Sequence, residues 1–171
     1  MKKISTRSLA QAGLIAAAYM AVSVALAPFS FGAVQVRVSE ALTLLPVLSA
    51  VAVPGVTIGC LLTNAWGVAA GANLLGVLDI PLGTAATLIA ALLTRCLRRR
   101  PWLAALPPVL CNAVIIGAEL MALEAGGLSL PLFAVNALQV GAGEAVACCL
   151  LGLPLLRMLR GRFGDEETES G

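Results

Sequence analysis

The sequence contains no histidine, and its only lysines are Lys2 and Lys3. Histidine is the commonest general base and the commonest metal ligand, so its absence argues against acid–base catalysis and a metal site. The chain also lacks the GxxxxGKS/T pattern of ATPases, the HExxH pattern of zinc peptidases and the GxSxG pattern of serine hydrolases. We therefore expect a protein that is not an enzyme and that carries no cofactor or metal.

Charged residues are scarce as well. Only 12% of the 171 residues are charged, 60% are hydrophobic, and the mean hydropathy is +0.98. A soluble domain carries about a quarter charged residues, and no soluble fold could bury so much apolar surface. The composition predicts an all-α integral membrane protein with one compact domain.

Cysteine occurs five times, always within or at the end of an apolar run and never in a CxxC spacing. We interpret these residues as small buried apolar side chains rather than as redox or metal sites.

Six apolar segments divide the chain, and several are shorter than the ~20 residues of an ideal membrane-spanning helix. They cover residues 8–30, 39–53, 55–72, 80–97, 103–123 and 131–156. Prolines lie at or near most of their borders, where a missing backbone N–H costs little. We expect six transmembrane helices, some of them tilted or partly re-entrant.

The basic residues form three clusters that an even number of spans places on one side of the membrane. Ten of the eleven belong to these clusters: Lys2, Lys3, Arg7, Arg95, Arg98, Arg99, Arg100, Arg157, Arg160 and Arg162. The positive-inside rule assigns this side to the cytoplasm, so both termini are predicted to be cytoplasmic. The chain then divides into a membrane domain (residues 1–160) and a short acidic tail (residues 161–171) that we expect to be disordered.

Polar side chains recur inside the apolar segments, although a charge at the bilayer centre costs about 2.5–3.5 kcal/mol. Asn112 and Glu119 are two turns apart and share a helix face, while Asn136, Val140 and Glu144 follow one side of the last segment. We expect the polar residues to line one outward-facing cavity; the candidates are Arg37, Glu40, Asn64, Asp79, Asn112, Glu119, Asn136, Gln139 and Glu144.

Structural interpretations remain open beside this functional one. Arg37 and Glu40 could form an ion pair at a helix start, and Asp79 could be an ordinary N-cap ahead of Pro81. The asparagines could form hydrogen bonds between helices. Glu144 lies deepest and has no basic residue within its own span, so a functional role is favoured there.

Small residues repeat at a spacing of four in the first segment, where Ala12 and Ala16 form one pair and Ala17 and Ala21 another. Such faces allow helices to approach closely. Packing within the bundle and docking onto a partner protein explain the pattern equally well.

Several stretches together resemble the QueT family, substrate-binding S components of energy-coupling-factor (ECF) transporters. They are APFSFGAVQVRVSEALTLLP (27–46), GCLLTN (59–64), LDIPLGTAATL (78–88), LPPVLCNAVIIGAEL (106–120), NALQVGAGE (136–144) and LGLPLL (151–156). Each motif alone is weak, but together they keep the order and span positions of the family over residues 9 to 158.

The resemblance implies a six-helix subunit, with cytoplasmic termini, in a prokaryotic cell membrane. It would capture a queuosine precursor, a 7-deazaguanine such as the 7-aminomethyl or 7-cyano compound, and no nucleic acid. A separate energising module, a membrane coupling protein with two ATPases, would supply ATP hydrolysis and would contact Ala12 and Ala16 or Ala17 and Ala21. The resemblance also places Gln35, Arg37 and Glu40 at the rim of the pocket.

The acidic excess within the membrane fits such a ligand, because carboxylates accept hydrogen bonds from the N–H groups of a deazaguanine and attract an aminomethyl cation. Phe29, Phe31 and Trp66 could stack on its ring. Three alternatives remain: an S component for a different vitamin, a self-sufficient carrier coupled to protons through Glu144, and a non-catalytic membrane scaffold.

Overall fold

The computed structural model describes residues 5–30 and 36–163, and every regular element within these ranges is a helix. The α-helices are α1 (Thr6–Ala25), α2 (Ala27–Ser30), α3 (Ala52–Ala69), α4 (Asp79–Cys96), α5 (Leu106–Ala125), α6 (Leu130–Ala145) and α7 (Leu153–Phe163). Three 3-10 helices, η1 (Val38–Val47), η2 (Gly76–Leu78) and η3 (Leu103–Ala105), and a π-helical stretch, η4 (Val146–Gly152), complete the bundle. The all-α prediction is confirmed.

Five segments are long and apolar enough to cross a membrane within the described residues. The second predicted span covered residues 39–53. The helix found there, η1, is shorter and has only ten residues. At about 2.0 Å per residue a 3-10 helix of this length rises about 20 Å, against about 30 Å for the hydrocarbon core. Pro46 lies inside η1, where the missing N–H disfavours α-helical hydrogen bonding.

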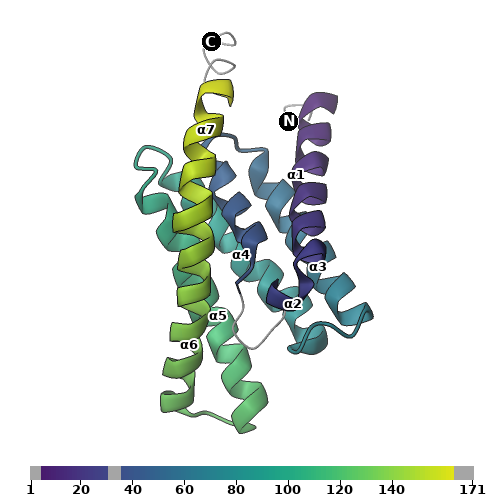
Figure 1. Cartoon of the computed structure of the whole chain (residues 1–171), viewed down its shortest axis with the longest axis vertical. Coiled ribbons are helices and arrows are strands. Elements are labelled where there is room, and N and C mark those ends of the chain that lie inside the picture. Colours follow the sequence, from purple (N-terminus) through teal and green to yellow (C-terminus); the bar gives the residue numbers. More distant parts are fainter. Residues whose placement is uncertain (1–4, 31–35, 164–171) are drawn as a thin grey trace.

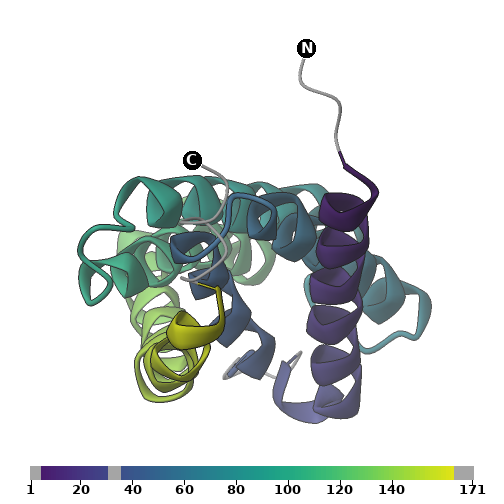
Figure 2. The ribbon, with the colours of Figure 1, turned by 90° about the horizontal axis from the view of Figure 1, so that it is seen from above.

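The short helix η1 lies in the middle of the bundle and contacts α1, α3, α4 and η4. Around it, α1 packs on α3, α3 on α4, α4 on α5 and α5 on α6 (Figure 1). The start of α1 and the end of α7 lie at the same end of the bundle, as an even number of crossings requires. We call this the basic end, because the arginines after α4 and in α7 belong to it. The view along the bundle shows α1 at its edge (Figure 2).

Glycines on α3 allow α1 to approach closely. A Cβ atom at Gly59 would lie 2.7 Å from the Tyr19 Cβ and 3.1 Å from the Ala16 carbonyl oxygen, and one at Gly55 would lie 3.1 Å from the Ala12 carbonyl oxygen. Ala12 and Ala16 are accordingly buried. The pair Ala17 and Ala21 is exposed on the other side of α1.

The last helix runs without a break from α6 through η4 into α7. Pro154 in the first turn of α7 cannot donate a hydrogen bond, and its ring would collide with a carbonyl one turn earlier. The wider π-helical turns of η4 precede it directly and relieve this conflict. The helix α7 ends at Phe163, and residues 164–171 of the predicted tail (residues 161–171) lie outside the described residues, so the division into a membrane domain and a tail stays a prediction.

The interpretation of the cysteines as buried was right for Cys60 and Cys148 and wrong for Cys96 and Cys149, which are exposed. An apolar residue on the outside of a membrane bundle can face lipid, so hydrophobicity alone does not predict burial here.

Replacing Gly59 by alanine should destabilise the bundle, because the added methyl group overlaps α1. We expect the free energy of unfolding to fall by about 1–3 kcal/mol, the usual cost of overpacking, seen as a lower thermal midpoint in detergent. Gly13→Ala is the matched control: nothing lies within 4 Å of a Cβ there, so its midpoint should stay or rise. A midpoint for Gly59→Ala at or above that of the unchanged protein would contradict the packing described.

Candidate functional site

Nine of the ten candidate residues are described by the structure, and eight of these are buried inside the bundle. None of the eight is more than 5% exposed: Arg37, Glu40, Asn64, Asp79, Asn112, Glu119, Asn136 and Glu144. Gln139 was expected to face the interior cavity with them, but it is exposed on α6. The tenth candidate, Gln35, lies outside the described residues.

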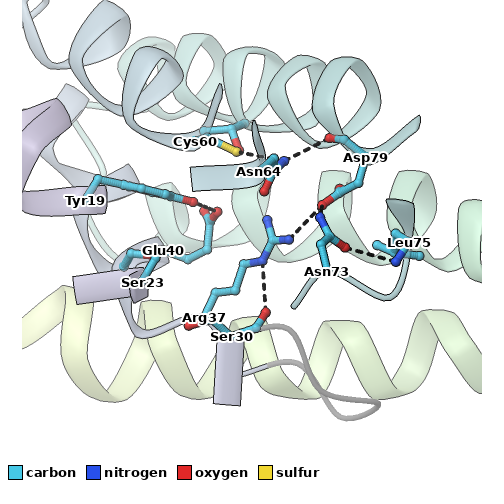
Figure 3. A network of polar contacts seen from close by, with 12 residues as sticks. Tyr19, Ser23, Ser30, Arg37, Glu40, Cys60, Asn64, Asn73, Leu75 and Asp79 are labelled. Atoms are coloured by element: carbon cyan, nitrogen blue, oxygen red, sulfur yellow. Dashed lines mark hydrogen bonds and ion pairs between the residues drawn. The ribbon is translucent and has the colours of Figure 1, made fainter. Parts of the chain in front are cut away.

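Arg37, at the start of η1, joins three parts of the chain (Figure 3). Its Nη2 donates to Asp79 Oδ2 across 3.0 Å, and its Nε donates to the Ser30 carbonyl oxygen across 3.3 Å. The sequence suggested Glu40, three residues away, as the ionic partner. The ion pair at 3.0 Å is formed with Asp79, from 42 residues further along the chain.

Asp79 is the first residue of α4, and the interpretation as an N-cap is wrong. The N-cap position is Leu78, and no side chain caps this helix. The Asp79 carboxylate instead accepts from Arg37 and, across 2.7 Å, from the Asn73 amide. Its place in the first turn is still favourable, since the helix dipole stabilises an anion there. Asn73 was not among the predicted site residues. The sequence marks it only as a polar residue in the turn before α4.

Asn64 on α3 holds the start of α4 from the other side. Its Nδ2 donates to the Asp79 carbonyl oxygen across 2.9 Å. Gly83 makes room for this contact, because a Cβ atom there would lie 2.6 Å from Asn64 Nδ2 and would overlap the Asp79 carboxylate.

Glu40 lies one turn into η1 and faces α1. Tyr19, which is fully buried, donates a hydrogen bond from its hydroxyl to Glu40 Oε1. Ser23 and Ser39 form a second link between the same elements at 2.6 Å. Tyr19 was not among the predicted site residues, because one tyrosine in an apolar helix resembles an interface anchor.

Glu119 and Glu144 supply two further buried carboxyl groups from α5 and α6. The predicted shared faces are confirmed: Asn112 and Glu119 both point into the bundle, as do Asn136, Val140 and Glu144. The Asn112 amide lies within hydrogen-bonding reach of the Glu144 carboxyl.

The Asn136 amide donates to Glu124 Oε2, near the end of α5, across 3.1 Å. Of the proposed stacking residues, Trp66 is half-buried, Phe31 lies outside the described residues and the side chain of Phe29 is not described.

Several buried oxygens of this cluster have no hydrogen-bond partner among the described residues. They are Glu40 Oε2, Asn64 Oδ1, Asp79 Oδ1, Glu144 Oε2 and both carboxyl oxygens of Glu119. No buried side-chain nitrogen of the described residues is left in this state. A buried polar atom without a partner costs about 1–3 kcal/mol, and each of these oxygens can accept a hydrogen bond. The described residues contain no group of three acids or cysteines suited to a metal.

Removal of either member of the Arg37–Asp79 pair should be far more harmful than removal of both. One buried charge without its partner costs about 3–5 kcal/mol. We expect Arg37→Met and Asp79→Asn each to lower the thermal midpoint strongly, and the double variant to recover part of the loss. The cycle of Arg37→Met with Glu40→Gln is the control and should show the smaller coupling. Additive effects in the first cycle would contradict a direct pair.

Comparison with known proteins gives one match. A family model described as QueT transporter matches residues 9–161. No curated protein and no solved structure matches the chain. The matched range contains every polar residue described above. The chain belongs to the QueT transporter family and is a membrane transport protein.

Proposed function

We propose that this chain is the substrate-binding S component of an ECF importer and captures a 7-deazaguanine queuosine precursor from outside the cell. Separate subunits, a membrane coupling protein and two ATPases, would supply ATP hydrolysis. The observation that carries the proposal on the ligand is the set of buried oxygens without donors. A ligand that fills this site must offer several N–H groups or a positive charge.

A 7-deazaguanine meets this requirement. Its exocyclic amine and the neighbouring ring N–H lie side by side and suit one carboxylate that accepts two bonds. Glu119 is the best candidate for this contact, because both of its carboxyl oxygens are free of partners within the described residues. The ring carbonyl needs a donor, and we propose the Asn112 amide, which lies close to Glu144, for this contact.

The surplus of acids favours the aminomethyl compound over the cyano compound. Glu40, Asp79, Glu119 and Glu144 are four buried acids, and Arg37 is the one buried base among the described residues. A cationic amine would offset part of this negative charge and would donate to the free oxygens. We propose Glu144 as its partner and Glu40 as a neighbour.

We propose Ala17 and Ala21 as the pair that contacts the coupling protein. Ala12 and Ala16 are buried against α3, whereas Ala17, Ala21 and Gly13 are exposed along one side of α1. Small side chains at this spacing allow a partner helix to approach closely.

Binding to the purified chain tests the ligand. We expect 7-aminomethyl-7-deazaguanine to bind more tightly than the cyano compound, and thiamine, riboflavin and biotin not to bind in calorimetry. Glu119→Gln should weaken both deazaguanines by about 10- to 150-fold, the loss of one hydrogen bond to a charged group. Glu144→Gln should weaken the aminomethyl compound more than the cyano compound.

Glu124→Gln is the control for these variants, because Glu124 is exposed and glutamine can still accept from Asn136. Absence of binding by either deazaguanine would refute the ligand, and tight binding of another vitamin would favour the alternative S component. A scaffold would bind none of these compounds, and its activity would survive replacement of Glu144.

Reconstitution into liposomes tests the energy source. Uptake should require ATP and the energising module, and should disappear when the chain is present alone. Ala17→Leu with Ala21→Leu should retain ligand binding but lose most ATP-driven uptake, because the larger side chains keep the coupling protein away. Ala18→Leu, exposed on a neighbouring face of α1, is the control. Uptake by the chain alone under a proton gradient would instead support the self-sufficient carrier.

A further inference from the structure

A cavity lies at the basic end, and none of the buried carboxylates lines it. It has a volume of about 210 Å³ and lies between the turn after α4 and the last helix. Its lining consists of Pro101, Trp102, Leu153, Leu156, Arg157 and Arg160. No polar residue of the proposed substrate site is among them, so this cavity needs a separate explanation.

Two arginines give the cavity its charge. Arg157 and Arg160 are three positions apart on α7, so they project from the same face. Both are exposed, and neither has a hydrogen-bond or ion-pair partner within the described residues. None of the carboxylates that the structure describes lines the cavity. Guanidinium groups match the oxygens of a phosphate in geometry and in charge.

The rest of the lining is apolar, and its two leucines pack against the core of the bundle. Leu156 is only 2% exposed and belongs to a core cluster with Leu44, Ala104 and Ala105, and Leu153 packs against this cluster. Trp102 stands at the rim and is 68% exposed. Along α7 the leucines precede the arginines, so apolar lining lies toward the membrane interior and charge toward the basic end. This is the order of acyl chain and phosphate in a phospholipid.

The neighbouring surface favours a lipid over a free anion. Large apolar side chains on the adjoining turns of α5, η4 and α7 are exposed: Leu106 at 48%, Leu110 at 59%, Leu150 at 67% and Met158 at 77%. Acyl chains would cover this surface, whereas inorganic phosphate would leave it bare. Exposed tryptophan is also typical of the level of the lipid headgroups.

We propose that the cavity between the α4–α5 turn and α7 binds the phosphate of an anionic phospholipid, with Arg157 and Arg160 on the phosphate and Trp102 against the glycerol and upper acyl chain. Basic pockets between membrane helices on the cytoplasmic side commonly bind acidic headgroups in this manner. The site is independent of the transported substrate.

Tryptophan fluorescence tests the proposal directly, since the chain has only two tryptophans. In a Trp66→Phe background the emission comes from Trp102 alone. In bilayers, phosphatidylglycerol brominated in its acyl chain should quench this emission more strongly than phosphatidylcholine brominated at the same position. Arg157→Gln with Arg160→Gln should lower the preference for phosphatidylglycerol by about 10- to 30-fold in relative affinity.

The control removes the same charge from outside the cavity. Arg98 and Arg99 are exposed at the same end and do not line it, so Arg98→Gln with Arg99→Gln should keep most of the preference. Equal losses in the two double variants would overturn the site in favour of general attraction to a charged surface. Equal quenching by the two lipids, or relief of quenching by millimolar inorganic phosphate, would also overturn it.

Discussion

A guanidinium buried among apolar helices is stable only beside an anion, and the Arg37–Asp79 ion pair fulfils this condition at the centre of the molecule. The pair connects the start of η1 with the start of α4, which are far apart in the sequence. Asn73 and Asn64 bind the same aspartate from the preceding turn and from α3. The short helix η1 can therefore occupy the middle of the bundle, although it is too short to span a membrane by itself.

The same constraint bears on the proposed binding of a ligand, because the buried acids outnumber the buried base among the described residues. Arg37 compensates one acid, and Tyr19 supplies a single hydrogen bond to another. Both carboxyl oxygens of Glu119, and one carboxyl oxygen each of Glu144 and Glu40, remain without donors among the described residues. Such groups are costly in an apolar surrounding unless something pairs with them. In the proposed function the substrate supplies these donors, so part of its binding energy comes from relief of this cost.

The sequence predicted the class of fold and the burial of eight polar candidates, though not the exposure of Gln139, because both follow from composition and helical spacing. Few polar side chains occur in so apolar a chain, and membrane insertion leaves them only the bundle interior. What the sequence could not supply was pairing between distant segments. Arg37 was matched with its neighbour Glu40 since spacing within one helix is readable, whereas its contact with Asp79 depends on how η1 packs on α4.

The remaining differences have the same origin. The sequence carries no signal for the role of Tyr19 and only a weak one for Asn73, because each role depends on the position of a partner outside its own element. Pro46 marked the second segment as irregular but did not reveal that it is a 3-10 helix of ten residues. The sequence could not show which alanine pair on α1 packs within the bundle, because that depends on the glycines of α3, against which Ala12 and Ala16 are buried.

The most direct test of the central claim, that unpaired buried carboxylates recognise a donor-rich substrate, is a structure of the chain bound to 7-aminomethyl-7-deazaguanine. The account predicts ligand N–H groups within hydrogen-bond distance of Glu119 and the aminomethyl group beside Glu144, with the Arg37–Asp79 pair intact. A ligand bound elsewhere, or one that contacts Arg37 while these carboxyl groups remain without donors, would contradict it.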